Sequence, residues 1–73
     1  MATDICILLG RKIKELRTSR GWRQIDLEAH SGVGKNHISE LERGQREIGL
    51  INLEAIAIAL DIKPSDLLRL SGF

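Results

Sequence analysis

The chain has 73 residues, a single cysteine and a net charge of +1, so it forms one small domain without an internal disulfide. No apolar run approaches the ~18 residues of a spanning helix, Met1 to Leu9 lacks the basic start of a signal peptide, and a free Cys6 suits a reducing compartment, which together predict a cytoplasmic protein. Because no zinc-ligand spacing, Ser/His/Asp set, paired-carboxylate cleft or phosphate loop is visible, we expect no metal, no cofactor and no enzymatic activity.

A first helix is predicted from about Thr3 to Ser19, because its apolar residues recur with the 3.6-residue period of an amphipathic helix. Gly21 is a natural stop for this helix. Trp22, which follows, is interpreted as a hydrophobic lid at the start of the next element. The apolar stripe of the first helix contains Ile5, Leu8, Leu9, Ile13 and Leu16.

Two short helices follow, from about Gln24 to His30 and from about Lys35 to Leu41. Gly32 separates them at a point where the chain must reverse sharply, and glycine accepts the positive φ that such a turn needs. The pair is typical of a helix-turn-helix, whose second helix enters the major groove of DNA while the first rests on the backbone. The residues spaced to hold the two helices together are Leu27, Val33, Ile38 and Leu41.

A fourth helix is predicted from about Leu50 to Leu60, and a fifth opens at Pro64, a favoured first helical residue. The fourth helix is apolar on two nearly opposite faces, and one face is enough for the domain core. The second face therefore predicts a twofold homodimer, whose interface we assign to Ile51, Ala55, Ile58, Leu67, Leu68 and Leu70. The alternative is that the fifth helix alone covers this second face.

Positive charge is concentrated in the middle of the chain. Residues 11–46 hold nine of the eleven Lys and Arg but five of the ten acids, a net charge of +4, whereas the remaining residues carry −3. This distribution favours a protein with one face for nucleic acid, although charged helix surfaces are also common without any ligand.

The first turn of the second helix of the motif carries Lys35, Asn36 and His37, which are candidates for base contact. Lys can donate to guanine O6 and N7, and Asn can pair with adenine N6 and N7. Glu40, one turn further on, is left with two interpretations: it accepts from cytosine N4, or it disfavours wrong sequences.

Over residues 10–68 the sequence resembles the Cro and phage-repressor type of helix-turn-helix protein. The matching stretches include Ile13-Lys-Glu-Leu-Arg17, Gly21-Trp-Arg-Gln24, Ser31-Gly-Val33, Leu41-Glu-Arg-Gly44 and Pro64-Ser-Asp-Leu-Leu68, in the family's order and spacing. The resemblance implies an all-α, lambda-repressor-like domain of five helices spanning residues 1–73, with the helix-turn-helix in helices 2 and 3.

Within that family the chain looks most like the controller proteins of bacterial restriction–modification systems, through Glu42-Arg-Gly-Gln-Arg46. This resemblance implies homodimers that bind paired half-sites of a double-stranded DNA operator and regulate their own gene and the endonuclease gene. Two dimers on one operator and a contact with RNA polymerase are further expectations. The alternatives are a phage-type repressor and a DNA-binding antitoxin, although an antitoxin needs a segment to mask its toxin and few residues follow Leu68.

The resemblance also assigns roles to single residues. It implies DNA contacts for Ser39 and Arg46, which we assign to bases, although a minor-groove contact or a phosphate clamp is the alternative for Arg46. It also implies a structural salt bridge between Arg17 and Glu42 that joins the first helix to the end of the third. We expect phosphate contacts from the two ends of the motif, at Gln24 and Arg43. The chain departs from the family at Glu28, where a small residue is usual, and at Gly34, where Ser or Thr caps the helix.

Overall fold

A computed structural model describes residues 3–72 and contains five α-helices and no strand within them. The helices are α1 (Thr3–Ser19), α2 (Gln24–Ser31), α3 (Lys35–Glu42), α4 (Leu50–Ala59) and α5 (Pro64–Leu70). The predicted all-α class is confirmed, and the first four helices have the predicted bounds to within one residue. None of the helices in this part of the chain has the length and apolar content to cross a membrane.

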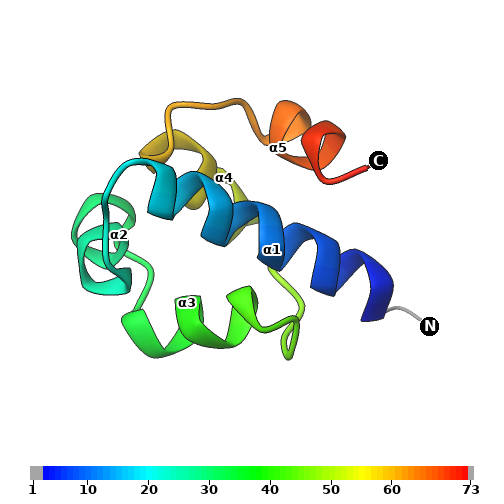
Figure 1. The fold of residues 1–73 in the computed structure, drawn as a ribbon, viewed down its shortest axis with the longest axis horizontal. Helices are drawn as coiled ribbons and strands as arrows, with labels where there is room; N and C mark the ends of the chain where they lie inside the picture. Colours follow the sequence, from blue (N-terminus) through cyan, green and yellow to red (C-terminus); the bar gives the residue numbers. More distant parts are fainter. Residues whose placement is uncertain (1–2, 73) are drawn as a thin grey trace.

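The longest helix, α1, runs through the middle of the molecule, and the other four helices lie around it (Figure 1). In this view α3 lies below α1, α2 lies across its C-terminal end, α4 lies behind it and α5 lies above it. α2 packs against both α3 and α4, and α5 packs against both α1 and α4. The α2–α3 pair therefore forms one side of the domain, and α5 forms the opposite side.

Every helix contributes at least one completely buried side chain to the core, and the largest of these come one from each helix. These five residues are Ile13, Leu27, Ile38, Ile56 and Leu67. The assignment of Leu67 to a dimer interface is therefore wrong, because the side chain is 0% exposed and fills the centre of its own protomer. The periodicity of α5 was too short to show which of its leucines face inward.

The N-terminal end of α1 extends beyond the helices that cover the rest of it (Figure 1). Ile5 and Leu8, which the helical period places on the core stripe, are consequently 42% and 38% exposed, whereas Leu9 and Ile13 are buried. The period of an amphipathic helix identifies its apolar side but does not say how far along that side its neighbours reach.

α1 and the end of α3 meet almost backbone to backbone at Gly10. A Cβ placed on Gly10 would lie 2.2 Å from the carbonyl oxygen of Leu41 and 3.0 Å from that of Glu42. Glycine is therefore required at this position by contact with a neighbouring helix, although Gly10 lies inside a helix, where glycine is otherwise unfavourable.

Gly10→Ala is expected to push α1 away from α3 and to lower the free energy of unfolding by roughly 1–3 kcal/mol, as for other overpacked contacts. Thermal unfolding followed by circular dichroism measures the change. Gly49→Ala is the control, since nothing lies within 4 Å of its added carbon and its φ of −76° suits alanine. Equal melting temperatures for the two variants would show that α1 shifts without loss at Gly10.

Candidate nucleic-acid interface

The corner between α2 and α3 is rigid because its turn is short and its apolar residues are buried. Gly32 ends α2 with a φ of +79°, and its N–H donates to the carbonyl of Glu28 at 2.8 Å. Ser31 Oγ then accepts the N–H of Val33 at 3.1 Å, and Val33 is buried. Glu28, one of the two departures from the family pattern, is half-buried on α2 and leaves this corner intact.

The start of α2 is stabilised by Asp26. The backbone N–H of Arg23 donates to Asp26 Oδ2 at 2.7 Å, and the Arg23 Nε lies 3.4 Å from the same oxygen. These contacts lower the pKa of Asp26 below its usual value, the backbone hydrogen bond being the largest cause. A carboxylate in the first turn also interacts favourably with the positive end of the helix dipole.

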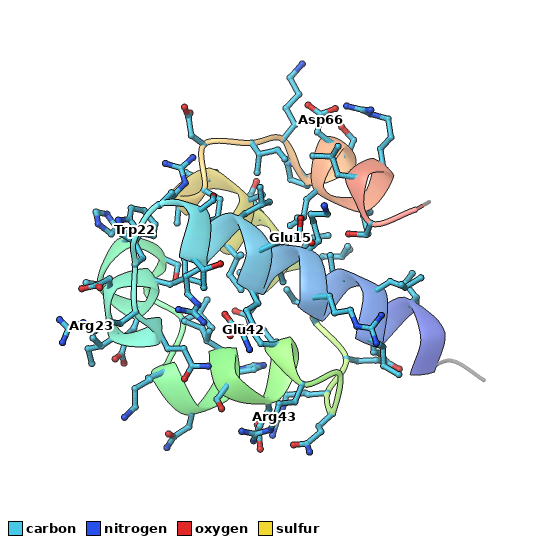
Figure 2. The ribbon with its side chains drawn as sticks, viewed as in Figure 1. Glu15, Trp22, Arg23, Glu42, Arg43 and Asp66 are labelled. Carbon is cyan, nitrogen blue, oxygen red and sulfur yellow. The ribbon has the colours of Figure 1, made fainter. Side chains whose placement is uncertain are left out.

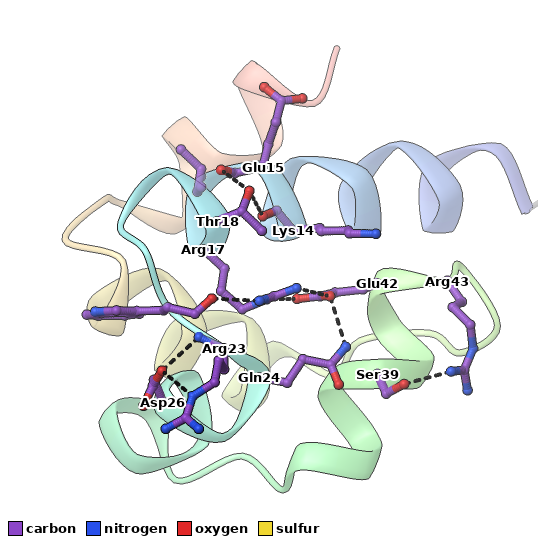
Figure 3. A network of polar contacts seen from close by, with 12 residues as sticks. Lys14, Glu15, Arg17, Thr18, Arg23, Gln24, Asp26, Ser39, Glu42 and Arg43 are labelled. Carbon is purple, nitrogen blue, oxygen red and sulfur yellow. Dashed lines mark hydrogen bonds and ion pairs between the residues drawn. The ribbon is translucent and has the colours of Figure 1, made fainter.

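Arg17 and Glu42 form a two-point ion pair between α1 and the end of α3 (Figure 3). Arg17 Nε donates to Glu42 Oε2 at 2.6 Å and Nη2 donates to Oε1 at 3.0 Å, while the two side chains are 9% and 3% exposed. The remaining Nη1 donates to the carbonyl of Trp22 at 2.7 Å. Arg17 therefore connects three parts of the fold and leaves little of its side chain exposed for a phosphate.

Gln24 joins this network instead of pointing away from the protein. Its side-chain Nε2 donates to Glu42 Oε1 at 3.1 Å, and the residue is half-buried (Figure 3). Because the first N–H groups of a helix have no partner within the helix, the group that Gln24 can offer a phosphate is its backbone N–H. The prediction of a phosphate contact at Gln24 thus rests on its backbone, held in place by its side chain.

The outer side of α3 is a strip of polar residues that no other helix covers. Lys35 and Asn36 are exposed at its start, and Ser39 and Glu40 follow at helical spacing. Arg43 ends the strip and points away from the body of the protein, whereas the adjacent Glu42 points inward toward α1 (Figure 2). The geometry therefore projects the start of α3 and this strip into solvent, as a groove-reading helix requires.

The two arginines after α3 are each held by side chains of the same region. Arg43 Nη1 donates to Ser39 Oγ at 2.7 Å, and Arg43 Nε donates to Gln45 Oε1 at 3.1 Å. Arg46 Nε lies 2.9 Å from Glu40 Oε1. Sequence reasoning missed Gln45 and the pairing of Glu40 with Arg46, because both contacts depend on how the chain turns at Gly44.

His37 differs from its neighbours in the first turn of α3. Its Nε2 is buried without a hydrogen-bond partner, and the residue is half-buried. Because Nε2 is turned into the protein, the predicted base contact of His37 stays a prediction that depends on the other ring nitrogen, Nδ1. Its position on α3, four residues before the buried Leu41, places it on the flank of the helix that packs inward.

Trp22 lies just before α2 and covers part of the core, in agreement with its interpretation as a hydrophobic lid. Its ring stacks on that of His30 with centroids 4.2 Å apart and an interplanar angle of 5°. The Arg20 guanidinium lies 5.3 Å from the ring centroid, and Arg20 also donates to the carbonyl of Leu60. Trp22 is half-buried against the core, which leaves little of its ring for stacking on a base.

A second surface, the apolar side of α4, carries large side chains that the domain leaves uncovered. Ile51 and Ile58 are 82% and 68% exposed, and Leu70 on α5 is 45% exposed. Leu50, which the sequence analysis left out, is 83% exposed. The other predicted interface residues, Ala55 and Leu68, are partly buried against the core.

Comparison with known proteins identifies the class. A family model described as helix-turn-helix matches residues 13–67. The control protein C.BamHI from Bacillus amyloliquefaciens is 36% identical over 69 residues, which cover 93% of this chain and 85% of that protein. The chain belongs to the helix-turn-helix family of DNA-binding transcription regulators.

Two solved structures show the same fold. The restriction–modification controller protein C.AhdI from Aeromonas hydrophila matches with a TM-score of 0.81 and 39% identity, over 85% of this chain and 94% of that one. The clp gene regulator ClgR from C. glutamicum matches with a TM-score of 0.85 and 28% identity, over 92% of this chain and 86% of that one. The chain is therefore similar to controller proteins in sequence and fold, and shares its fold with a regulator of another kind.

Proposed function

We propose that this chain is a restriction–modification controller, which binds paired operator half-sites as a homodimer and regulates its own gene and the endonuclease gene. The similarity to C.BamHI and C.AhdI over nearly the whole chain supports this assignment. The observation that carries the DNA-binding mechanism is the uncovered polar strip of α3, whose first residues stand clear of the protein. The protein works in the cytoplasm, and further expected interactions are pairing of two dimers on one operator and contact with RNA polymerase.

In this proposal the residues of the motif divide by what they bind. Lys35 and Asn36 read base edges, because the start of α3 enters the major groove first. The backbone of Gln24 and the guanidinium of Arg43 hold phosphates on either side. Ser39 and Arg46, for which the resemblance to controller proteins implies base contacts, complete the set.

The second part of the proposal is dimerisation through the apolar side of α4. Three large side chains on this helix, Leu50, Ile51 and Ile58, are each more than two-thirds exposed. Apolar surface of this kind on a small domain marks a contact with another molecule. A second copy that covers it with the same residues would place two recognition helices about 34 Å apart, one turn of DNA.

Asn36→Ala is expected to weaken binding to the operator by about 1–3 kcal/mol and to leave binding to random DNA nearly unchanged, because Asn36 reads bases. Arg43→Ala is expected to weaken both, and to flatten the dependence of log K on log salt by about 0.9, because one phosphate contact is lost. The measurement is a salt titration by fluorescence anisotropy.

The probes are a duplex enriched by the wild-type protein from a randomised pool and a scrambled duplex of the same composition. Lys35→Ala provides an internal comparison, since a charged residue that also reaches guanine should change both the discrimination and the salt slope. Equal weakening of both duplexes by Asn36→Ala would remove Asn36 from the base readers. A wild-type protein that enriches no duplex would contradict the proposed function itself.

A further inference from the structure

Glu40 is an acidic side chain on a surface that faces polyanionic DNA in the proposed function. It lies on the uncovered strip of α3, is 40% exposed and pairs with Arg46 through Oε1 at 2.9 Å. The other acid of α3, Glu42, is buried and bonded to Arg17, so it has a structural role. Glu40 forms no such buried ion pair, so a structural role of this kind does not account for its position.

Folding stability does not explain the Glu40–Arg46 pair either. Both side chains are substantially exposed, at 40% and 52%, and ion pairs in water add little to stability. An acid at this position also opposes binding, since it repels the phosphates that approach α3. A charge that weakens general affinity and does not stabilise the fold has an effect on selectivity instead.

The geometry of the pair indicates how this selectivity arises. Glu40 contacts the Nε of Arg46, which leaves the two terminal nitrogens of the guanidinium without a side-chain partner in the described contacts. Two terminal N–H groups side by side match guanine O6 and N7, the commonest base pairing of arginine. Held in this way, Arg46 can meet a base edge while its guanidinium is kept from the nearest phosphates.

We propose that Glu40 is a specificity-determining residue that holds Arg46 for base contact and suppresses binding to DNA of the wrong sequence. The proposal rests on the DNA-binding function proposed above. Without the Glu40 charge, Arg46 is free to bind phosphates on any duplex. Affinity therefore increases mainly for random DNA, which has no matching base for Arg46 in the orientation that Glu40 imposes.

Glu40→Gln tests the proposal, because glutamine keeps an oxygen acceptor and removes the charge. At about 0.1 M salt the variant is expected to bind the scrambled duplex about five- to tenfold more tightly, with a salt slope steeper by about 0.9, the effect of one added phosphate contact. Affinity for the enriched duplex should stay unchanged or fall, so that the ratio between the two duplexes decreases.

Asp66→Asn is the matched control. Asp66 is an exposed acid that pairs with an arginine, Arg69, at 3.4 Å, and it lies on α5 at the opposite side of the molecule from Arg43 (Figure 2). This variant removes the same charge but should leave the ratio between the duplexes at its wild-type value. A second arm combines Glu40→Gln with Arg46→Ala, which should abolish the gain on the scrambled duplex.

Two results would overturn the proposal. If Glu40→Gln changes both duplexes no more than Asp66→Asn does, the Glu40 charge has no local role. If the gain on the scrambled duplex persists without Arg46, Glu40 does not act through that arginine. In both cases the wild-type protein still prefers the enriched duplex. Failure of this proposal is therefore distinguishable from failure of the DNA-binding function, in which the wild type enriches no duplex.

Discussion

Replacing Arg17 with alanine is expected to lower the free energy of unfolding by roughly 3–5 kcal/mol, because it leaves the Glu42 carboxylate buried without its cation. The same change removes the donor that the Trp22 carbonyl accepts. For a domain of this size the melting temperature should fall by more than about 10 °C, as measured by circular dichroism. Glu15→Ala, which breaks the pair with Lys12 at a side chain that is 70% exposed, is the control and should change the melting temperature very little.

Removing both charges separates the cost of leaving one charge buried alone from the net contribution of the Arg17–Glu42 pair to stability. Apolar residues of similar volume often replace a buried ion pair without loss, so Arg17→Met with Glu42→Leu should lose less stability than the sum of the single changes. An Arg17→Ala protein that melts like the wild type but binds DNA weakly would instead make Arg17 a phosphate contact.

Replacing Ile51 with aspartate is expected to convert a dimer to monomers and to weaken operator binding by about 10²–10⁴-fold. The large effect arises because a dimer presents its second recognition helix at high effective concentration once the first is bound. Folding should be unaffected, since Ile51 is 82% exposed in the protomer. Analytical ultracentrifugation at tens of micromolar measures the assembly, and helicity by circular dichroism checks the fold.

The dimer experiment needs a substitution that changes assembly without changing folding, and a control outside the predicted interface. Ile25→Asp, on α2, is the control for sedimentation, because Ile25 is also an exposed isoleucine, at 45%, but is not part of the predicted interface. Leu68→Asp is less suitable, since Leu68 is packed against the core and its loss would affect folding and assembly together. A wild-type chain that sediments as a monomer at this concentration would contradict the predicted dimer.

The helices were predictable from sequence because their ends carry local signals. Gly32 requires a turn whatever the remainder of the fold does, and Pro64 at the first position of α5 fixes the backbone there. The inward sides of the longer helices also followed from periodicity, as at Ile13 and Ile56. These features depend on a few neighbouring residues, which the sequence displays directly.

Other features depend on contacts between distant segments, and sequence reasoning missed or misassigned them. Leu67 was placed in an interface although it completes the core, because the short α5 gives too few residues to define an inward side. The contacts of Arg46 with Glu40, and of Gln24 with Glu42, follow from the packing of one element on another. The half-buried ring of His37 has the same origin.

The single shared core also determines how this domain can open. Each helix supplies at least one completely buried side chain to the same cluster, so no helix can leave without exposing apolar surface on the helices that it packs against. We therefore expect no independent order–disorder transition of the recognition helix, and expect its hydrogen-bonded amides to exchange with solvent mainly through opening of the whole domain. The recognition helix is thus ordered only when the whole domain is folded. A destabilising change anywhere in the core cluster therefore reduces the fraction of molecules that can bind DNA.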